Sequence, residues 1–496
     1  MAALLFFYFA GFHIRALNLL LHGMHKPAGM PNRFAFVFIF LLLSAAAEGW
    51  GRAGKIGKKE RMAGLAVCLI SCAAIGIKTA DLKITGTCGF ILLYFFLLTE
   101  NAGIYRQIRR QKLVVFLLLC EIGVHSVLSI CSMGTANRNL YEESGKELRQ
   151  AVSTLQESEN GRTVIVNPQL RNEELLYQLN GVSMFSSTNT DSMQVWMRKM
   201  GFETGNNRFQ YAGETELMDM LLGIRYLACR NTIRPDTPYT KVHGGRYFDL
   251  YENPRALAEG YLADSGIRDF RLDGKNPFEN QNNLLQKMGV GTLYQTREIS
   301  PLPKQGSSKE SVFEIQLKGG EHGYLWIDGT EPAAVNINGR LQQNGYWNNN
   351  FLDLGYSDED RSVRVTVRKN PIAQALLGTC GQSRLDGIYQ KLSRNELRLE
   401  KGSGTIRADR DGVLFFSAFY DQGIHVKIDG QDVPALDLEG MLGVRINKGR
   451  HTVSLSYETP GLKAGIAVSL LSLGMAGTYP AWKWKHKRKA AGAIRG

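Results

Sequence analysis

The chain has 496 residues, 44% of them hydrophobic, and a formal net charge of +13. Such a charge is compatible with nucleic-acid binding, but its excess is confined to three clusters that flank apolar runs. The clusters at 52–61, 106–112 and 483–495 hold 15 basic residues and one acidic residue, which leaves the rest of the chain near −1. Because Lys and Arg gather on the cytoplasmic side of membrane helices, the pattern indicates membrane topology. We expect the lipid bilayer as a partner and no nucleic acid.

Apolar runs in the N-terminal part of the chain, positions 1–132, predict a bundle of transmembrane helices. The strongest is Leu113–Cys131, since about 20 apolar residues cross a bilayer core. The first run contains His13 and Arg15, which must face protein or water, and it lacks the features of a signal peptide. The predicted helices occupy residues 2–21, 34–50, 62–78, 84–100 and 113–131.

The basic clusters also predict the orientation of the chain. They place residue 1 in the cytoplasm, the loop 22–33 outside, and residues 133–460 beyond the membrane. A further apolar run, at 461–480, returns the chain to a basic cytoplasmic tail at 481–496. The glycines of this last helix would allow close helix packing.

The long region between the membrane segments predicts several domains. Residues 133–260 mix short strands with short helices, for example Ser192–Met200 and Glu214–Leu222, and indicate an α/β domain. Strand signals dominate afterwards, with Gly378–Leu392 as a helical connector. Val363, Val365 and Val367 alternate as in a half-buried strand. We therefore predict two β-sandwich modules, at 261–375 and 376–460.

Cysteine usage and the familiar catalytic patterns exclude several classes of protein. Only Cys229 and Cys380 of the seven cysteines lie in the region outside the membrane, which excludes a disulfide framework or a CxxC metal site. No Walker A lysine motif, GxSxG or HExxH is present. We assign no catalytic residue, metal or cofactor. The histidines of the strand-rich region are expected at the surface or in loops: His243, His322, His425 and His451. The aspartates Asp328, Asp353 and Asp429 are expected in turns.

Candidate ligand-binding residues lie first at the membrane. Glu121 and His125 share one face of a helix, either satisfying each other between packed helices or handling substrate. The external loop offers His22, His25 and Arg33. Arg33 suits a phosphate of a lipid-linked sugar donor, or it is an interfacial arginine that reaches toward the headgroups.

A second candidate is the loop 180–189, which is rich in amides and hydroxyls. Asn180, Ser186, Ser187 and Asn189 would bind sugar hydroxyls. The alternative is a loop whose polar side chains satisfy one another and its own backbone.

Several of these segments together resemble the bacterial YfhO family. They are His22–Pro27 with Pro31–Phe34, the helix carrying Glu121, Asn180–Asn189, Leu221–Tyr226 and Lys448–Leu462. The chain departs from the family pattern at Asn32, where tyrosine is usual, at Ile424, where tryptophan is usual, and at His125, where asparagine is usual.

The resemblance implies a function. The family is similar to GT-C membrane glycosyltransferases, which use a polyprenyl-phosphate sugar, and it is implicated in glycosylating lipoteichoic or related wall polymers. Such enzymes place a catalytic acid in the first external loop of a longer bundle, so we expect this chain to match the C-terminal portion of a family member. Our leading hypothesis is a membrane component of cell-surface polymer glycosylation. The alternative is a non-enzymatic, membrane-anchored binding or assembly protein.

Overall fold

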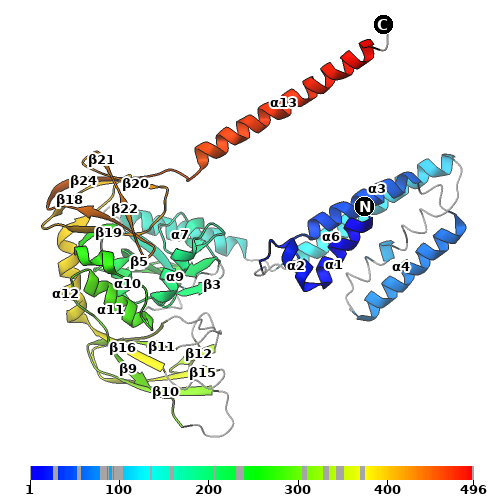
Figure 1. Cartoon of the computed structure of the whole chain (residues 1–496). Coiled ribbons are helices and arrows are strands. Elements are labelled where there is room, and N and C mark those ends of the chain that lie inside the picture. The colour runs from blue at the N-terminus through cyan, green and yellow to red at the C-terminus, as the bar shows by residue number, and fades with distance from the viewer. Residues whose placement is uncertain are drawn as a thin grey trace. The chain divides into compact units, whose positions relative to one another are not determined.

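The structure is a computed structural model, and it divides the chain into two compact units, Met1–Asn137 and Arg138–Gly496. Figure 1 shows the elements in chain order. The residues that the structure describes are 2–25, 32–52, 57–78, 87, 89–91, 93, 104–133, 137–156, 161–166, 168, 170–205, 207–230, 239–303, 310–327, 334–341, 351–368 and 375–493.

The first unit is helical. Its helices are α1 (Ala2–His13), α2 (Arg15–Leu21), α3 (Ala35–Arg52), α4 (Lys58–Lys78) and α6 (Ile104–Ser132). Large apolar side chains such as Phe36 and Phe40 are exposed on α3, as expected for helices that face lipid. The helix predicted at 84–100 falls largely outside the described residues.

The first apolar run is not the single helix that its composition predicts. Ile14 has an extended backbone between α1 and α2, and the two helices meet at 110°. The bend is held by packing, because the Phe12 and Phe34 rings stack at 5.0 Å and the Asn18 amide donates to the Gly11 carbonyl at 3.0 Å.

Within the described part of the chain, one helical segment is long and apolar enough to cross a membrane, Lys112–Ser132. The bent pair α1–α2 makes a second if it is counted as one span. Shorter apolar helical segments lie at Ala35–Gly49 and Leu462–Thr478. The second of these opens the long helix α13 (Leu462–Ala493).

The second unit begins with an α/β layer. Strands β1 (Arg162–Val166) and β5 (Ile224–Arg230) pair in parallel, and the sheet continues in the order β1-β5-β7-β6 with β7 (Phe248–Glu252) and β6 (Thr240–Gly244). Helix α7 (Arg138–Gln156) covers this sheet through Leu148 and Val152.

Short elements around this sheet form the region of the candidate site. They are α8 (Glu173–Leu176), β2 (Met184–Phe185), α9 (Asp191–Lys199), β3 (Glu203–Gly205), β4 (Arg208–Gln210) and α10 (Glu216–Leu221). Thr190 accepts the Met193 N–H at the start of α9, and Thr215 accepts the Met218 N–H at the start of α10. Such side-chain caps satisfy helix donors that have no partner within the helix, so both predicted helices begin close to the expected positions.

A first pair of four-stranded sheets follows, introduced by η2 (Ser265–Asp269) and α11 (Pro277–Lys287). The two sheets share one hydrophobic core, to which β15 contributes fully buried Val363, Val365 and Val367, as their alternation predicts. The first sheet has the order β10 (Glu310–Leu317), β15 (Arg361–Arg368), β12 (Ala334–Ile337), β13 (Arg340–Leu341). The second has the order β14 (Leu352–Ser357), β11 (Glu321–Trp326), β16 (Ala375–Gly381), β9 (Gln295–Ile299).

The predicted connector 378–392 is only partly helical. Its first residues complete β16, and the helix α12 begins at Gln382 and ends at Leu392. The short η3 (Ser393–Asn395) follows it.

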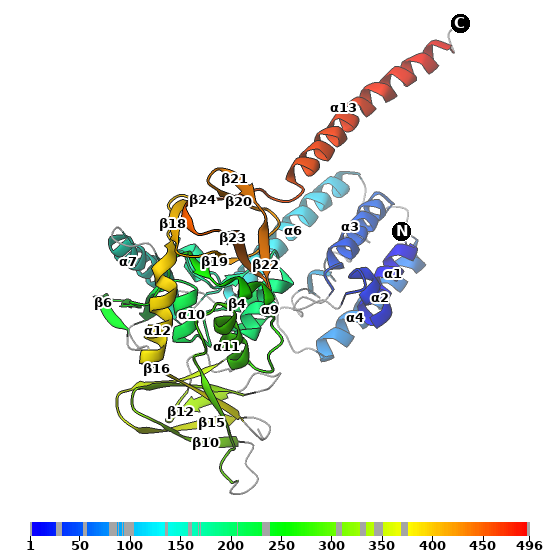
Figure 2. The same cartoon turned by 60° about the vertical axis from the view of Figure 1, so that its left-hand side comes forward.

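The last pair of sheets encloses its own core. Its five-stranded sheet runs β17 (Glu396–Leu397), β8 (Gly260–Ala263), β19 (Gly412–Phe419), β23 (Met441–Ile446), β22 (Ala435–Leu438). The other sheet runs β18 (Ser403–Ala408), β24 (Gly449–Tyr457), β20 (Ile424–Ile428), β21 (Gln431–Val433). Strand β8 therefore pairs with strands that follow the whole first pair of sheets in the sequence. Both views place the two pairs of sheets at opposite ends of this unit, with α10 and α11 between them (Figure 1, Figure 2).

Candidate functional site

The candidate site is a groove of about 480 Å³ in the second unit. One wall comes from α8, the loop after it and α9, and the other comes from the end of β19, the start of β20 and the end of β24. We call it the α8–β19 groove. Its lining residues are Arg162, Glu174, Leu175, Gly181, Val182, Ser183, Met184, Thr188, Asn189, Met193, Met197, Phe209, Leu222, Ser417, Ala418, Phe419, Asp421, Ile424, Met441 and Tyr457.

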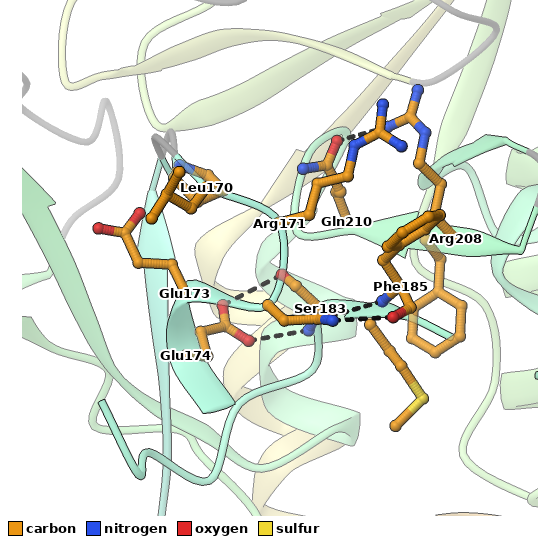
Figure 3. Close-up of a pocket in the computed structure, with 12 residues that line it drawn as sticks. Leu170, Arg171, Glu173, Glu174, Ser183, Phe185, Arg208 and Gln210 are labelled. Carbon is orange, nitrogen blue, oxygen red and sulfur yellow. Dashed lines mark hydrogen bonds between the residues drawn. The ribbon is translucent and has the colours of Figure 1, made fainter. Parts of the chain in front are cut away.

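Glu174 fixes the loop that forms the first wall. Its carboxylate accepts the Ile165 N–H at 3.1 Å, the Ser183 N–H at 2.9 Å and the Ser183 hydroxyl at 3.1 Å. Figure 3 shows the bonds between Glu174 and Ser183. Burial raises the pKa of Glu174 to about 6, against the opposing effect of these hydrogen bonds. A Cβ on Gly181 would lie 1.9 Å from Glu174 Oε2, so any side chain at this position would displace the Glu174 carboxylate or the loop.

Asn189 is the predicted loop residue that reaches the groove. Its amide nitrogen donates to the Asn207 carbonyl at 3.0 Å. Its Oδ1 is buried and has no hydrogen-bond partner within the described part of the chain. A buried acceptor without a partner costs about 1–3 kcal/mol, which a ligand hydroxyl or a water would recover.

The other three predicted loop residues do not line the groove. The Ser186 hydroxyl lies 2.7 Å from the Thr188 hydroxyl and accepts the Thr188 N–H at 3.1 Å, so it closes the loop on itself. Asn180 is exposed and lines a smaller recess beside Arg225 and Arg398. Ser187 is exposed.

Aromatic and charged residues shape the opposite wall. The Phe419 ring lies edge-on to Trp196 at 6.0 Å and near Phe209 at 5.6 Å, which makes part of the floor apolar. The Arg162 guanidinium donates to the Leu222 carbonyl and to the Ser417 carbonyl at 2.6 Å. Burial lowers its pKa. An apolar floor with a few hydrogen-bonding groups at its edge suits an organic ligand better than a compact ion.

A smaller recess of about 10 Å³ adjoins the groove and shares Glu174, Ser183, Met184 and Phe209 with it. Figure 3 shows the Arg171 and Arg208 side chains extending to the same side of this recess. The Arg171 guanidinium lies over the Phe185 ring at 5.1 Å. Arg208 is instead paired with Glu203 at 2.7 Å.

The membrane-side loop candidates are held by the first unit. The His22 Nδ1 lies 2.7 Å from the Asn18 carbonyl, and its Nε2 lies 3.2 Å from the Arg33 N–H. A carbonyl only accepts and a backbone N–H only donates, so His22 carries its proton on Nδ1 and both ring nitrogens are engaged. His22 therefore positions the backbone of Arg33. His25 and Arg33 are exposed, and Lys26 lies outside the described residues.

Glu121 and His125 border a wide recess of about 670 Å³ on α6. The Glu121 Oε1 and His125 Nε2 are 3.9 Å apart, which is too long for a hydrogen bond. The His125 Nε2 lies closer to the Thr87 hydroxyl, at 3.2 Å. The two residues are therefore neighbours at ion-pair distance on one face of α6.

Sequence analysis missed a buried charged cluster. His322, expected at the surface or in a loop, is fully buried, with Nδ1 2.6 Å from Glu216 and Nε2 2.6 Å from Asp353. Burial opposes protonation, but the two carboxylates outweigh it and raise the pKa of His322 to about 10. Gln382 and Arg255 also bond Glu216, at 2.7 Å and 3.3 Å. We call these five residues the His322 cluster.

The His322 cluster joins elements rather than lining a cavity. It connects α10, β11, β14 and α12. One signal for it lay in the sequence, because His322 and Tyr324 are two apart on a strand and so share a face. Their rings stack at 4.4 Å. Among the described residues, no group of three or more His, Cys, Asp or Glu is arranged to hold a metal ion.

A helical segment long and apolar enough to cross a membrane, followed by a large second unit of α/β and β structure, has the features of a membrane protein. The model of the family "Bacterial membrane protein YfhO" matches residues 1–469. The chain belongs to this family.

One relative of this chain is a longer protein. The chain is 21% identical over 540 residues to the uncharacterized protein YfhO of Bacillus subtilis (strain 168), and the match covers 93% of this chain and 60% of the relative. The chain therefore spans about three fifths of that relative.

Two solved structures show a weak similarity to part of the chain. Two structures of a GH2 β-galacturonidase from Eisenbergiella tayi, bound to galacturonate and to glycerol, each cover 34% of this chain and cover 38% and 37% of their own chains. The identity is 10% and the TM-score 0.13 in both cases, so this similarity carries no argument.

Proposed function

We propose that this chain is a membrane component of cell-surface polymer glycosylation, and that the α8–β19 groove holds the carbohydrate chain of the acceptor. The observation that carries the proposal is the groove itself, with its apolar floor, its hydroxyls and the buried Oδ1 of Asn189. Lipoteichoic acid or a related wall polysaccharide is the acceptor class, and residues 133–460 lie outside the cell.

The reaction in the complete system is attack of an acceptor hydroxyl on the anomeric carbon of a polyprenyl-phosphate sugar. A base takes the hydroxyl proton, the new glycosidic bond forms, and polyprenyl phosphate leaves. We assign the base to no residue of this chain. The loop carrying Arg33 and the recess beside Glu121 and His125 are the places in the first unit for the donor phosphate and lipid.

A second candidate is a membrane-anchored protein that binds or assembles the polymer without chemistry. It is favoured by Glu174, the buried carboxylate of the groove, because three hydrogen bonds from Ile165 and Ser183 occupy its oxygens. A carboxylate engaged in this way serves structure better than it serves proton transfer.

The test uses the full chain reconstituted in lipid nanodiscs. Purified lipoteichoic acid is titrated onto the wild type, onto Asn189→Ala and onto Asn283→Ala, whose amide on α11 is outside the groove lining. We expect weakened binding for Asn189→Ala alone. Equal binding by the wild type and both variants would contradict the groove assignment.

A radiolabelled polyprenyl-phosphate sugar then separates the two functions. Transfer of label to the polymer, with any partner chain restored, supports the glycosylation role. Binding without transfer supports the assembly role. The absence of both would contradict the proposal as a whole.

A further inference from the structure

Four exposed apolar side chains lie on α8 and beside the wall that α8 gives to the α8–β19 groove. Leu170, Leu175, Leu176 and Phe185 are each at least 40% exposed. Leu175 lines the groove, and Leu170 and Phe185 line the recess that adjoins it. Exposed apolar groups gathered at one place mark an interaction surface, and we call this one the α8 face.

The α8 face is built rigidly. Asn172 has a left-handed backbone, with φ of 61°, and its amide donates to the Phe185 carbonyl at 2.8 Å while it accepts the Phe185 N–H at 2.6 Å. The Arg171 guanidinium covers the Phe185 ring. The protein therefore holds a large exposed ring and a cation side by side, instead of allowing the ring to fold inward.

The α8 face lies beside the start of α7, the helix that follows a candidate membrane span in the sequence. The candidate span ends at Ser132, and α7 begins at Arg138 with five residues between them. Tyr141, in the first turn of α7, contacts Tyr177 with ring centroids 6.1 Å apart, and Tyr177 directly follows Leu176.

The start of the C-terminal apolar helix α13 also lies close in the chain to the groove. Tyr457 lines the groove together with Leu175, and the apolar helix α13 begins at Leu462. Five residues reach at most about 17 Å. If α13 enters the membrane, as its composition predicts, the segments of the second unit that lead to the two apolar helices, at Tyr141 and Tyr457, both lie beside the α8 face.

We propose that the α8 face seats on the membrane surface, with Leu170, Leu175, Leu176 and Phe185 in contact with lipid and Arg171 at the phosphate level. Leucine and phenylalanine beside a basic residue are the composition of interfacial membrane-binding surfaces, and a guanidinium pairs well with phosphate. The inference holds for either orientation of the chain, so it does not depend on the proposed function. It places the groove mouth beside the lipid, within reach of polymers anchored there.

The test is spin labelling of the full chain in nanodiscs of phosphatidylglycerol and phosphatidylcholine. Alanine replaces the cysteines of the first unit, while the buried Cys229 and Cys380 remain. Nitroxide labels are attached to Leu176→Cys and Phe185→Cys, with Lys318→Cys, an exposed residue after β10, as the control. Collisions with oxygen report contact with lipid, and collisions with a nickel chelate report contact with water.

We expect a several-fold higher ratio of oxygen to nickel accessibility at 176 and 185 than at 318, with unchanged thermal unfolding of the variants. Nickel accessibility equal to that at 318 would overturn the inference. Labels shielded from both reagents would also overturn it, because they would indicate a protein partner on this face.

Discussion

The His322 cluster and the α8–β19 groove both contain buried polar groups, but they use them in opposite ways. In the cluster, each ring nitrogen of His322 has a carboxylate partner, and Glu216 has two more donors. In the groove, Glu174 is satisfied by the loop that it holds, whereas Asn189 Oδ1 is left without a partner among the described residues. The satisfied groups hold the fold, whereas the unpartnered acceptor is left for a ligand.

The largest expected loss of stability comes from breaking the His322 cluster. His322→Leu removes the imidazolium between the buried carboxylate of Glu216 and the partly exposed carboxylate of Asp353, which costs about 3–5 kcal/mol. Chemical unfolding of the full chain in detergent, followed by fluorescence, measures the loss. His425→Ala removes an exposed histidine and should change stability by less than about 0.5 kcal/mol. Equal effects of the two variants would show that the cluster is not an important contact.

The second prediction follows from the raised pKa of His322. Its folded value of about 10 exceeds the ordinary value of 6.5, so between these limits the folded state binds the extra proton. The stability from this group is complete below pH 6.5 and is lost as the pH rises through 10. We expect the free energy of unfolding to fall by up to about 1.4 kcal/mol per pH unit between pH 7 and 9. In His322→Leu this component of the pH dependence should be absent; an unchanged slope would refute the assignment.

The third prediction disturbs the groove wall. In Gly181→Ala the new methyl group meets the Glu174 carboxylate, so the loop must shift, at a cost of about 1–3 kcal/mol. Polymer binding should weaken with it. Gly387→Ala, on α12 with open space around its Cβ, is the matched control and should be neutral or stabilising by up to about 1 kcal/mol. Unchanged polymer binding by Gly181→Ala would show that this loop does not contact the ligand.

The smallest expected effect is a difference in polymer binding between two residues of the same loop, Asn189 and Ser186. Asn189→Ala removes one ligand hydrogen bond, worth about 0.5–1.5 kcal/mol or roughly a 2- to 12-fold change in affinity, with little change in stability. Ser186→Ala, in the same loop but bonded to Thr188, should leave affinity unchanged. A nanodisc titration with lipoteichoic acid measures both. The reverse order of effects would favour Ser186 as the ligand contact.

Local patterns predicted much of the second unit. The alternation of Val363, Val365 and Val367 set the buried face of β15, because side chains on a strand point to alternate faces. The helices predicted at Ser192–Met200 and Glu214–Leu222 form close to those bounds, at Asp191–Lys199 and Glu216–Leu221. The composition of 180–189 pointed to the loop of the groove, but not to the division of roles between Asn189 and Ser186, which depends on backbone turns.

Long-range contacts and one local break could not be predicted. His322 meets Glu216 and Asp353 from 106 and 31 residues away, and nothing local encodes those distances. The far wall of the groove comes from Phe419, Asp421 and Tyr457, which lie in the last pair of sheets, far along the chain from the loop. The bend at Ile14 was missed because an apolar run carries no signal for the tertiary packing of Phe12 and Phe34 that holds it.

The pairing of β8 has a consequence for biosynthesis. Its partners β17 and β19 are made long after it, so this interior strand of the sheet has no partner on either side until the whole first pair of sheets has been translated. Closing this sheet therefore requires synthesis to proceed as far as Ile446 of β23, shortly before α13 begins at Leu462. A chain arrested by a stop codon or a stalled ribosome before that point would carry an unpaired edge, which is a ready substrate for quality-control proteases.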